Sequence, residues 1–282
     1  MKIYALYNGL SGNGTGEEKA KKAMETWKDR DLSFFDITNI SSYEVFFNKI
    51  SSDDLLVLCG GDGTLNRFVN DTQNVPYPCS VYLAPTGTGN DFWRDIKGGA
   101  EPRDITKYLF DLPVVTVKGK DYRFINGVGY GIDGYCCEVA DKIRESGNTK
   151  PINYSAIAIK GLLFHFTPRK AHVVVDGKEY DFEGTWIAPT MKGRFYGGGL
   201  MAAPDQDRLD PERKVSLVVM GGAGRIPTLL TFSGFSKGTH VKNKMVKIFT
   251  GKEITVSFDI SCALQIDGET VLDVKTYTVK AV

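Results

Sequence analysis

The first half of the chain alternates short apolar runs with segments whose apolar residues recur at helical spacing. Apolar runs at residues 2–8, 54–59 and 81–84 predict strands, because each is short and bounded by glycine, proline or polar residues. Helical spacing marks two of the segments between them, at Ala20, Ala23, Met24 and Trp27 and again over 43–50. Strands that are separated by helices predict a mainly parallel α/β sheet.

The second half changes to closely spaced strand patterns. Apolar runs flank Gly119-Lys120 and Asp176-Gly177, and short polar dipeptides with glycine are typical of hairpin turns. Further runs predict strands at 185–191, 214–220, 244–250, 253–259, 262–267 and 271–280, with helices near 132–145 and 153–166. The whole pattern predicts an α/β domain of residues 1–118, then an antiparallel β-sandwich of residues 119–282, with an active-site cleft between them.

Three glycine-rich loops follow predicted strands of the first half, at residues 11–16, 60–64 and 85–91. The carboxyl ends of parallel strands share one edge of a sheet, so we expect these loops to lie together. Glycine lets the backbone approach phosphates, and the start of a helix offers N–H groups to an anion. Asp62 lies between two glycines and would hold Mg²⁺ against phosphate oxygens. The loops predict a nucleotide site; the alternative is a set of tight turns without a ligand.

Another glycine pattern, G-x-G-x-x-G, occurs at residues 129–134. It follows an apparent Asn126-Gly127 turn in the strand-rich half, and no acidic residue ends a strand about twenty residues later. It therefore gives only a weak indication of a dinucleotide site.

Composition excludes several classes of function. The 35 Lys and Arg balance the 34 Asp and Glu, so we expect no nucleic-acid partner. The apolar runs are shorter than the roughly 18–20 residues of a membrane-spanning helix, and the sequence opens on a strand, so we expect neither a transmembrane segment nor a secretion signal. Five cysteines without a C-x-x-C pair indicate free thiols in a cytoplasmic protein.

Motifs along nearly the whole chain resemble those of the diacylglycerol-kinase-type lipid kinases, which include sphingosine kinases and bacterial lipid kinases. Residues 60–66, GGDGTLN, match the signature of that family, and residues 87–94, GTGNDFWR, are similar to its G-T-x-N-D-F-A-R. The other similar segments are the opening Asn8, Ser11 and Gly12, the N-x-x-G-x-G-x-D of 126–133, the glycine-rich run of 197–205 and the late D-G-E of 267–269. A GGDGT loop alone also occurs in NAD kinases and phosphofructokinases, but this ordered set is specific.

The resemblance implies an ATP- and Mg²⁺-dependent kinase that phosphorylates a lipid hydroxyl, with diacylglycerol as the default acceptor and phosphatidic acid as the product. It implies a nucleotide-binding domain like that of NAD kinases, a role in phospholipid metabolism, and a lipid that enters the cleft. The implied ATP contacts are Asn8, Ser11, Gly12, Thr38, Gly60, Gly61, Asp62, Gly63, Thr64, Asn66, Thr88, Asn90 and Asp91. The implied metal ligands are Asp62 and Asp210.

Three carboxylates are the candidate catalytic residues. Phosphoryl transfer requires positioning, charge neutralisation and an oriented hydroxyl. Asp62 would neutralise charge through Mg²⁺, and the resemblance assigns the general base to Glu269, beside Asp267. The alternative for these last two residues is a hairpin turn whose glutamate is solvated.

Three positions depart from the family pattern. Arg67 stands where the family has an acid, Gly9 replaces a proline, and Asp210-Pro211-Glu212 replaces D-D-G. These departures motivate the alternative of a nucleotide- or lipid-binding regulator without catalysis. An NAD kinase-like phosphotransferase is the other alternative.

Residues 153–170 combine apolar side chains with Lys160, Arg169 and Lys170. They form either an amphipathic membrane-docking element or a helix packed on the sandwich, and the second interpretation is preferred. A lipid kinase without a transmembrane segment meets its substrate at a bilayer surface, so we expect a cytoplasmic protein that associates peripherally with membranes during turnover. The sequence leaves a homodimer open.

Overall fold

The computed structural model describes residues 1–87, 89–147, 150, 152–222 and 224–282. Its contacts divide the chain into two units, Met1–Phe110 and Asp111–Val282, which are described separately. Strand β6 (Val114–Val117) belongs to the second unit, because it pairs with β17 (Glu269–Lys280). The boundary predicted after residue 118 refers to domains that fold independently of each other. That boundary stays a prediction.

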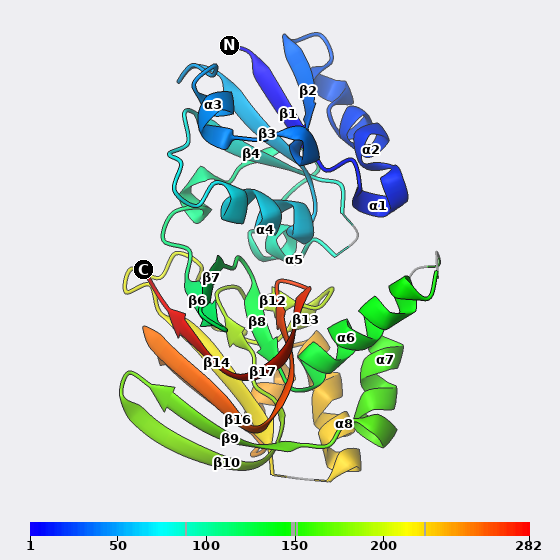
Figure 1. Ribbon diagram of the computed structural model, residues 1–282, viewed down its shortest axis with the longest axis vertical. Coiled ribbons are helices and arrows are strands. Elements are labelled where there is room, and N and C mark those ends of the chain that lie inside the picture. Colours follow the sequence, from blue (N-terminus) through cyan, green and yellow to red (C-terminus); the bar gives the residue numbers. More distant parts are fainter. Residues whose placement is uncertain (88, 148–149, 151, 223) are drawn as a thin grey trace. The chain divides into compact units, whose positions relative to one another are not determined.

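The first unit contains a five-stranded sheet with the order β2-β1-β3-β4-β5 (Figure 1). The strands are β1 (Ile3–Tyr7), β2 (Leu32–Asp36), β3 (Leu55–Gly60), β4 (Ser80–Pro85) and β5 (Arg103–Asp104). The first four are mutually parallel where they pair, and β5 runs antiparallel to β4. The predicted mainly parallel sheet is confirmed, while β2 and β5 were missed.

Helices cover both faces of this sheet (Figure 1). They are α1 (Ser11–Gly14), α2 (Gly16–Ala23), α3 (Tyr43–Phe47), α4 (Asp62–Asp71) and α5 (Asp91–Asp95), with short 3₁₀ turns at Glu25–Trp27, Ile37–Asn39 and Thr106–Tyr108. On one face Ala20 and Met24 pack against strand residues such as Val57. On the other, the ring of Tyr43 on α3 meets that of Phe68 on α4 at 5.6 Å. The helical spacing of apolar residues thus becomes two buried helix faces.

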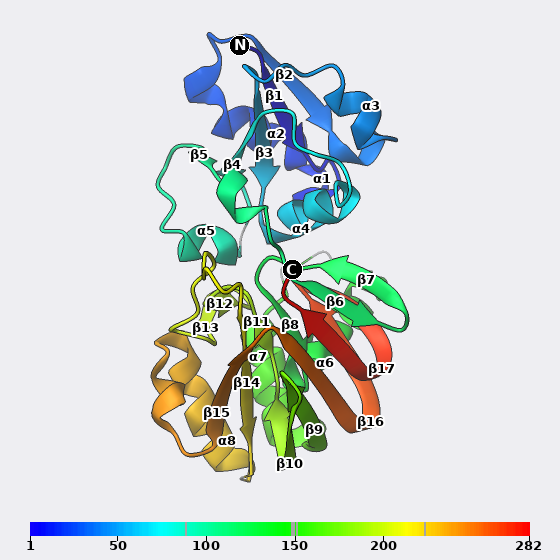
Figure 2. The ribbon, with the colours of Figure 1, turned by 90° about the vertical axis from the view of Figure 1, so that its left-hand side faces the viewer.

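The second unit is built on a ten-stranded sheet whose pairings are antiparallel (Figure 2). Besides β6 and β17, its strands are β7 (Lys120–Arg123), β8 (Gly127–Tyr130), β9 (Arg169–Val175), β10 (Lys178–Ile187), β11 (Thr190–Met191), β14 (Val215–Gly221), β15 (Val246–Gly251) and β16 (Glu253–Ile266). The first half of β16 pairs with β9 and its end pairs with β8, so the sheet curls back on itself. The predicted antiparallel β domain is confirmed.

Both predicted hairpins of this unit are present. β6 pairs with β7, and β9 pairs with β10 through Asp176 and Gly177, both of which have positive φ. The two strands predicted at 253–259 and 262–267 are one strand, β16, because Ile260 and Ser261 between them lie in an irregular stretch of the ladder rather than in a turn. The Asn126-Gly127 turn is also wrong, since Gly127 begins β8.

Helices of the second unit pack on one side of its sheet. They are α6 (Ile132–Glu145), α7 (Tyr154–Lys160), the π-helical turn η4 (Gly161–His165) and α8 (Arg225–Ser233), followed by 3₁₀ turns at Gly234–Ser236 and Thr239–Lys242. Leu162 and Phe166 are buried against Trp186, which confirms that the 153–166 segment packs on the β domain. Helix α8 was missed.

A two-stranded ribbon, β12 (Phe195–Tyr196) and β13 (Leu200–Met201), lies outside the large sheet. Three consecutive glycines, 197–199, form its turn, and all three have positive φ. The glycine-rich run before the predicted metal loop is therefore a hairpin turn.

Candidate active site

The first glycine loop leaves β1 at Asn8 and folds onto itself before α2 begins. The side-chain oxygen of Asn8 accepts the N–H of Leu10 at 3.0 Å, and its carbonyl accepts the N–H of Ser11 at 3.0 Å. Gly12 has φ of 57°, a conformation that favours glycine. A Cβ at Gly12 would lie 2.5 Å from the Lys19 ammonium, so a cation lies directly beside this loop.

Asp36, at the end of β2, joins this loop to the predicted ATP contact Thr38. Its Oδ1 accepts the N–H of Gly9 at 3.1 Å and the N–H of Thr38 at 2.9 Å. Burial raises the pKa of Asp36, but the hydrogen bonds from Thr38 and Gly9 outweigh burial and leave the pKa below its usual value. Asp36 was missed from the sequence, although it is an acid that directly follows an apolar run.

The signature loop 60–64 and the loop 85–91 form one tightly packed unit. The carbonyl of Gly60 accepts the N–H of Thr86 at 3.0 Å, and Asn90 Nδ2 donates to the carbonyl of Gly87 at 2.6 Å. A Cβ on Gly87 would lie 2.5 Å from the Cα of Gly61, and a Cβ on Gly61 would lie 2.9 Å from the Cα of Gly87. Neither position therefore has room for a side chain while the loops are in contact. The structure thus brings together these predicted nucleotide contacts, whereas Thr88 lies outside the described residues.

Asp62 is the side chain that ties the two loops together. Its Oδ2 accepts the N–H of Asp91 at 2.7 Å, and its Oδ1 accepts the N–H of Phe92 at 2.9 Å. These N–H groups belong to the first turn of α5, which has no intrahelical acceptor for them. Asp62 therefore has a structural role, and its role as a metal ligand stays a prediction. Thr64 and Asn66, also predicted as ATP contacts, are buried in the first turns of α4.

Arg67 replaces the acid of the family pattern and lies on the following turn of α4. Its Nε donates to Asp71 Oδ2 at 3.3 Å, one helical turn along. Its positive charge also lowers the pKa of Asp36, after the hydrogen bonds already described. The substitution therefore places a cation near the end of β2.

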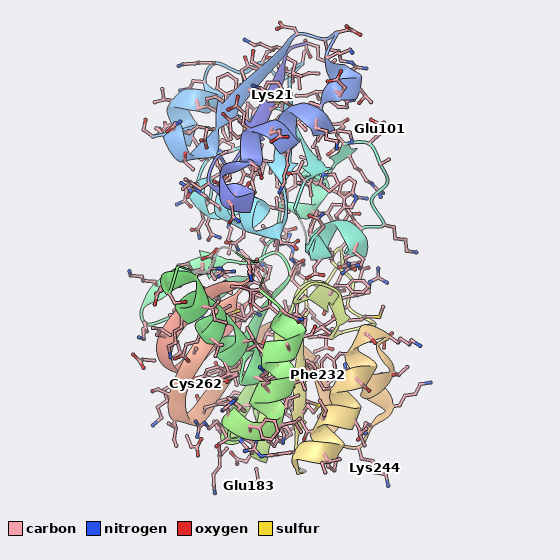
Figure 3. All side chains as sticks on the ribbon, turned by 90° about the vertical axis from the view of Figure 1, so that its right-hand side faces the viewer. Lys21, Glu101, Glu183, Phe232, Lys244 and Cys262 are labelled. Carbon is pink, nitrogen blue, oxygen red and sulfur yellow. The ribbon has the colours of Figure 1, made fainter. Side chains whose placement is uncertain are left out.

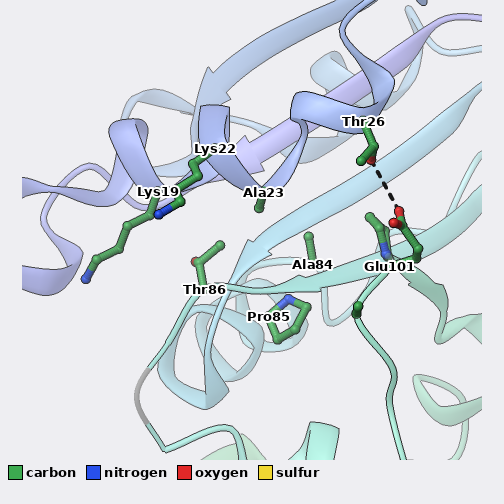
Figure 4. Close-up of a pocket in the computed structure, with 10 residues that line it drawn as sticks. Lys19, Lys22, Ala23, Thr26, Ala84, Pro85, Thr86 and Glu101 are labelled. Carbon is green, nitrogen blue, oxygen red and sulfur yellow. Dashed lines mark hydrogen bonds between the residues drawn. The ribbon is translucent and has the colours of Figure 1, made fainter.

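A hollow of about 440 Å³ lies between α2 and the end of β4 in the first unit (Figure 4). Lys19 and Lys22 of α2 lie at the end of the hollow where the Thr86 side chain lies. At its other end, Thr26 Oγ1 donates to Glu101 Oε2 at 3.2 Å. The two lysines add positive charge on the side of the glycine loops where phosphate would bind.

In the second unit, the turn between β16 and β17 carries the predicted catalytic pair. Asp267 Oδ2 accepts the N–H of Ile125 at 2.6 Å, while its Oδ1 accepts the N–H groups of Asn126 and Gly127 at 2.8 and 2.9 Å. This carboxylate therefore anchors the start of β8. Glu269 is exposed at the first position of β17, and the catalytic roles of both residues stay predictions.

Two buried cations lie close to that turn. Arg208 donates to the carbonyl of Ile125 and, at 2.5 Å, to Asn126 Oδ1, and the exposed fractions of Arg208 and Lys192 are 8% and 4%. Burial and then the charge of Arg208 lower the pKa of Lys192, against the attraction of nearby aspartates. Sequence reasoning missed both cations, because basic side chains are rarely buried.

Asp210, the second predicted metal ligand, has both oxygens engaged by its own loop. Oδ1 accepts the N–H of Glu212 at 3.2 Å and Oδ2 that of Lys214 at 2.9 Å. Its negative charge acts on the Lys192 ammonium. Across residues 1–87, 89–147, 150, 152–222 and 224–282, no group of three or more His, Cys, Asp and Glu side chains is arranged to hold a metal.

A buried carboxyl, Asp133, lies in the first turn of α6. Tyr196 donates its hydroxyl to Asp133 Oδ1 at 2.8 Å, and Oδ2 has no hydrogen-bond partner. Burial raises the pKa of Asp133 to about 8, and the tyrosine hydrogen bond opposes this only in part. The group is therefore mainly a neutral acid at neutral pH.

Comparison with known families matches these two units to two domains. Residues 2–118 match the diacylglycerol kinase catalytic domain, and residues 126–279, more than half of the chain, match the YegS C-terminal NAD kinase beta sandwich-like domain. The chain belongs to the family that joins a diacylglycerol kinase catalytic domain to a YegS C-terminal domain. The resemblance read from its motifs is confirmed, and membership of this lipid kinase family implies the use of ATP.

Individual relatives are distant in sequence. The chain is 24% identical over 229 residues to "Putative lipid kinase YtlR" of Bacillus subtilis strain 168, covering 76% of this chain and 73% of the relative. It is 24% identical over 274 residues to "Diacylglycerol kinase" of Mycobacterium tuberculosis strain CDC 1551, covering 90% and 84%.

A solved structure shares the fold of this family member. It is titled "Crystal structure of a putative diacylglycerol kinase from Bacillus anthracis str. Sterne" and aligns with a TM-score of 0.69 at 17% identity, over 99% of this chain and 91% of that one. In the described part of the chain, no helix has the length and apolar content that crossing a bilayer requires.

Proposed function

We propose that this protein is an ATP- and Mg²⁺-dependent lipid kinase that transfers the γ-phosphate to a lipid hydroxyl, with diacylglycerol as the default acceptor. The observation that carries the proposal is the pair of hydrogen bonds that the start of α5 donates to Asp62. These bonds join the signature loop 60–64 to the loop 85–91. A phosphate cradle requires such rigid, glycine-lined backbone, since phosphoryl transfer depends on positioning and charge neutralisation.

In this proposal the three glycine loops and Thr38 bind ATP, and Lys19 adds positive charge beside the first loop. Asp62 fits Mg²⁺, because its carboxylate lies where the loops 60–64 and 85–91 meet and carboxylate oxygens are ligands that Mg²⁺ prefers. Asp210 fits less well, because the Lys192 ammonium lies near it and would repel a cation. Bound Mg²⁺ would neutralise phosphate charge.

Glu269 is the general base of the proposed reaction. Its exposed position leaves the carboxylate open to an acceptor hydroxyl, and the anchored Asp267 fixes the turn that carries it. A base that accepts the hydroxyl proton typically contributes about 100-fold or more to the rate.

The first test presents purified protein and radiolabelled ATP with diacylglycerol, a sphingoid base and NAD. Label in phosphatidic acid supports the proposal. Label in NADP would instead indicate an NAD kinase, and ATP binding without transfer to any acceptor would indicate a regulator.

The second test replaces the base. Glu269→Gln should keep the fold and lower kcat by about 100-fold or more. The matched control is Glu179→Gln, a change at an exposed glutamate of the same unit, on β10, which should keep the wild-type rate. Wild-type turnover by Glu269→Gln would remove this residue from the mechanism. Asp62 variants are less informative, because they also break the tie between the loops.

A further inference from the structure

Four large apolar side chains are exposed on the helices of the second unit. Ile159 on α7 is 43% exposed, Phe164 on η4 is 70% exposed, and Ile226 and Leu230 on α8 are each 69% exposed. Single exposed apolar residues are ordinary on soluble proteins, but a group on adjoining elements marks an interaction surface. We name these elements, α7, η4 and α8, the α7–α8 surface.

These elements are in direct contact with one another. Arg225, the first residue of α8, donates to the carbonyls of Leu162 and Phe166 at 2.7 and 3.0 Å. Figure 3 shows α7 and α8 side by side, with Phe232 of α8 on the side of α7. The exposed residues therefore belong to one continuous side of the unit.

The same helices have another face that is already buried. Ala158 and Leu162 are in the core, as are Thr228 and Thr231 of α8. Ile226 and Leu230, which are four residues apart, lie together on the outer face of α8. Packing within the unit is thus satisfied without the exposed apolar residues.

Charge along these segments has one sign. Residues 146–175 and 213–252 contain no Asp or Glu, although the whole chain is balanced. They contain Lys150, Lys160, Arg169, Lys170, Arg213, Lys214, Arg225, Lys237, Lys242, Lys244, Lys247 and Lys252. The acids that pair with these basic residues come from outside the two segments: Glu183 pairs with Lys170 at 3.0 Å, Asp111 pairs with Arg213 at 3.2 Å, and Glu212 pairs with Lys214.

Exposed lysines flank α8 directly. Lys237 follows the helix after one 3₁₀ turn, and Lys242 and Lys244 adjoin Asn243, whose Nδ2 donates to Thr231 of α8 at 2.9 Å. Figure 3 labels Lys244 beside this helix. An apolar helix face bordered by lysines is the chemistry of a helix that lies in a bilayer interface.

We propose that the α7–α8 surface docks on an anionic lipid bilayer, with its four apolar side chains at the boundary of headgroups and acyl chains and its lysines on the headgroups. The proposal rests on the proposed function, because a bilayer presents the lipid acceptor. Charge complementarity favours a surface rich in anionic lipid. An acidic protein is the competing partner, which the test separates.

The test is flotation of the full-length protein with vesicles of phosphatidylcholine, with or without 30% phosphatidylserine. Wild type should float with the anionic vesicles, less so at high salt. Phe164→Gln with Leu230→Gln should weaken binding by roughly 100-fold or more, since the burial of two large apolar side chains is lost. Reversing Lys237, Lys242 and Lys244 to Glu should weaken it more at low salt than at high salt.

The control is Ile260→Gln, at a residue of the same unit that is 54% exposed and lies on β16. It should bind vesicles as wild type does, and circular dichroism should show every variant folded. Wild-type binding by the Phe164/Leu230 variant would overturn the proposal. So would a wild type that ignores anionic vesicles, which would favour a protein partner.

Failure of docking is distinguishable from failure of the proposed function, because flotation needs no turnover. A water-soluble short-chain diacylglycerol provides the second readout. The Phe164/Leu230 variant should phosphorylate it at the wild-type rate and lose activity only on vesicle substrates. Equal loss on both substrates would contradict docking, whereas vesicle binding without any kinase activity would support docking and overturn the proposed function alone.

Discussion

Asp133 is a single residue whose protonation should control stability. Its pKa of about 8 in the folded state lies above the usual aspartate value of 3.8, so the folded state binds this proton more tightly than the unfolded state. Its stabilising contribution is complete at low pH and is lost as pH rises from about 4 through 8. We expect the free energy of unfolding of wild type to fall between about pH 4 and pH 8, and that of Asp133→Asn to fall much less, in urea titrations.

Tyr196→Phe is the companion variant for this prediction. Its hydroxyl donates to Asp133 and lowers the pKa of that carboxyl, so removing it should move the pH transition upward. Identical pH profiles for wild type and Asp133→Asn would contradict a proton on this group.

How far the site could be predicted depends on where the partners of each residue lie. The meeting of the loops 60–64 and 85–91 was predictable. The strands before them end at Gly60 and Pro85, on one edge of a parallel sheet, so the two loops must lie together there. Arg208 was not predictable, since its acceptors Ile125 and Asn126 lie 83 and 82 residues away. Asp36 depends likewise on Gly9, 27 residues away. Such contacts are fixed by tertiary packing, which no local pattern encodes.

At the scale of elements, the contact between the loops 60–64 and 85–91 predicts opposite effects on stability for alanine at Gly87 and at Gly63. In Gly87→Ala the new methyl would lie 2.5 Å from the Cα of Gly61, so the loops must separate. We expect a loss of roughly 1–3 kcal/mol in unfolding free energy, as for overpacked cores, together with weaker ATP binding. Urea unfolding and calorimetric titration with ATP measure the two effects.

Gly63→Ala is the matched control, because a Cβ at Gly63 meets nothing within 4 Å. The protein should be as stable as wild type or slightly more so, since alanine suits a helix better than glycine. If the open space in front of Gly63 receives phosphate, ATP affinity should still fall. Equal stability of the two variants would contradict the tight loop contact.

The elements themselves were predictable where local signals were strong. The hairpin at Asp176-Gly177 was predictable, because Asp-Gly is a residue pair that readily adopts the positive φ angles of a hairpin turn. Both residues have positive φ in the structure. Helix α8 was missed because Pro227 and threonines interrupt its helical propensity, although proline is tolerated in a first turn. β16 was split in two because polar residues at its irregular stretch resemble a turn. Packing against neighbouring elements outweighs these weak local preferences.

At the scale of the whole molecule, the domain boundary is the prediction left to test. Sequence patterns place it after residue 118, whereas contacts group Asp111–Val282. The difference is strand β6, which pairs with β17 and buries Val115 and Val117 completely or nearly so. A fragment of residues 111–282 should therefore unfold cooperatively, as a unit with its own core.

A fragment of residues 119–282 lacks β6 and should be much less stable. Each fully buried valine contributes about 1.5–3 kcal/mol, and removing β6 also exposes the edge of β17 for pairing with other chains. We expect a lower urea midpoint and concentration-dependent association, measured by circular dichroism and sedimentation. Substituting both valines by Thr in the 111–282 fragment separates lost burial from lost pairing, because it keeps the strand. Equal stability of the 111–282 and 119–282 fragments would place the boundary at residue 118 and make β6 an accessory strand.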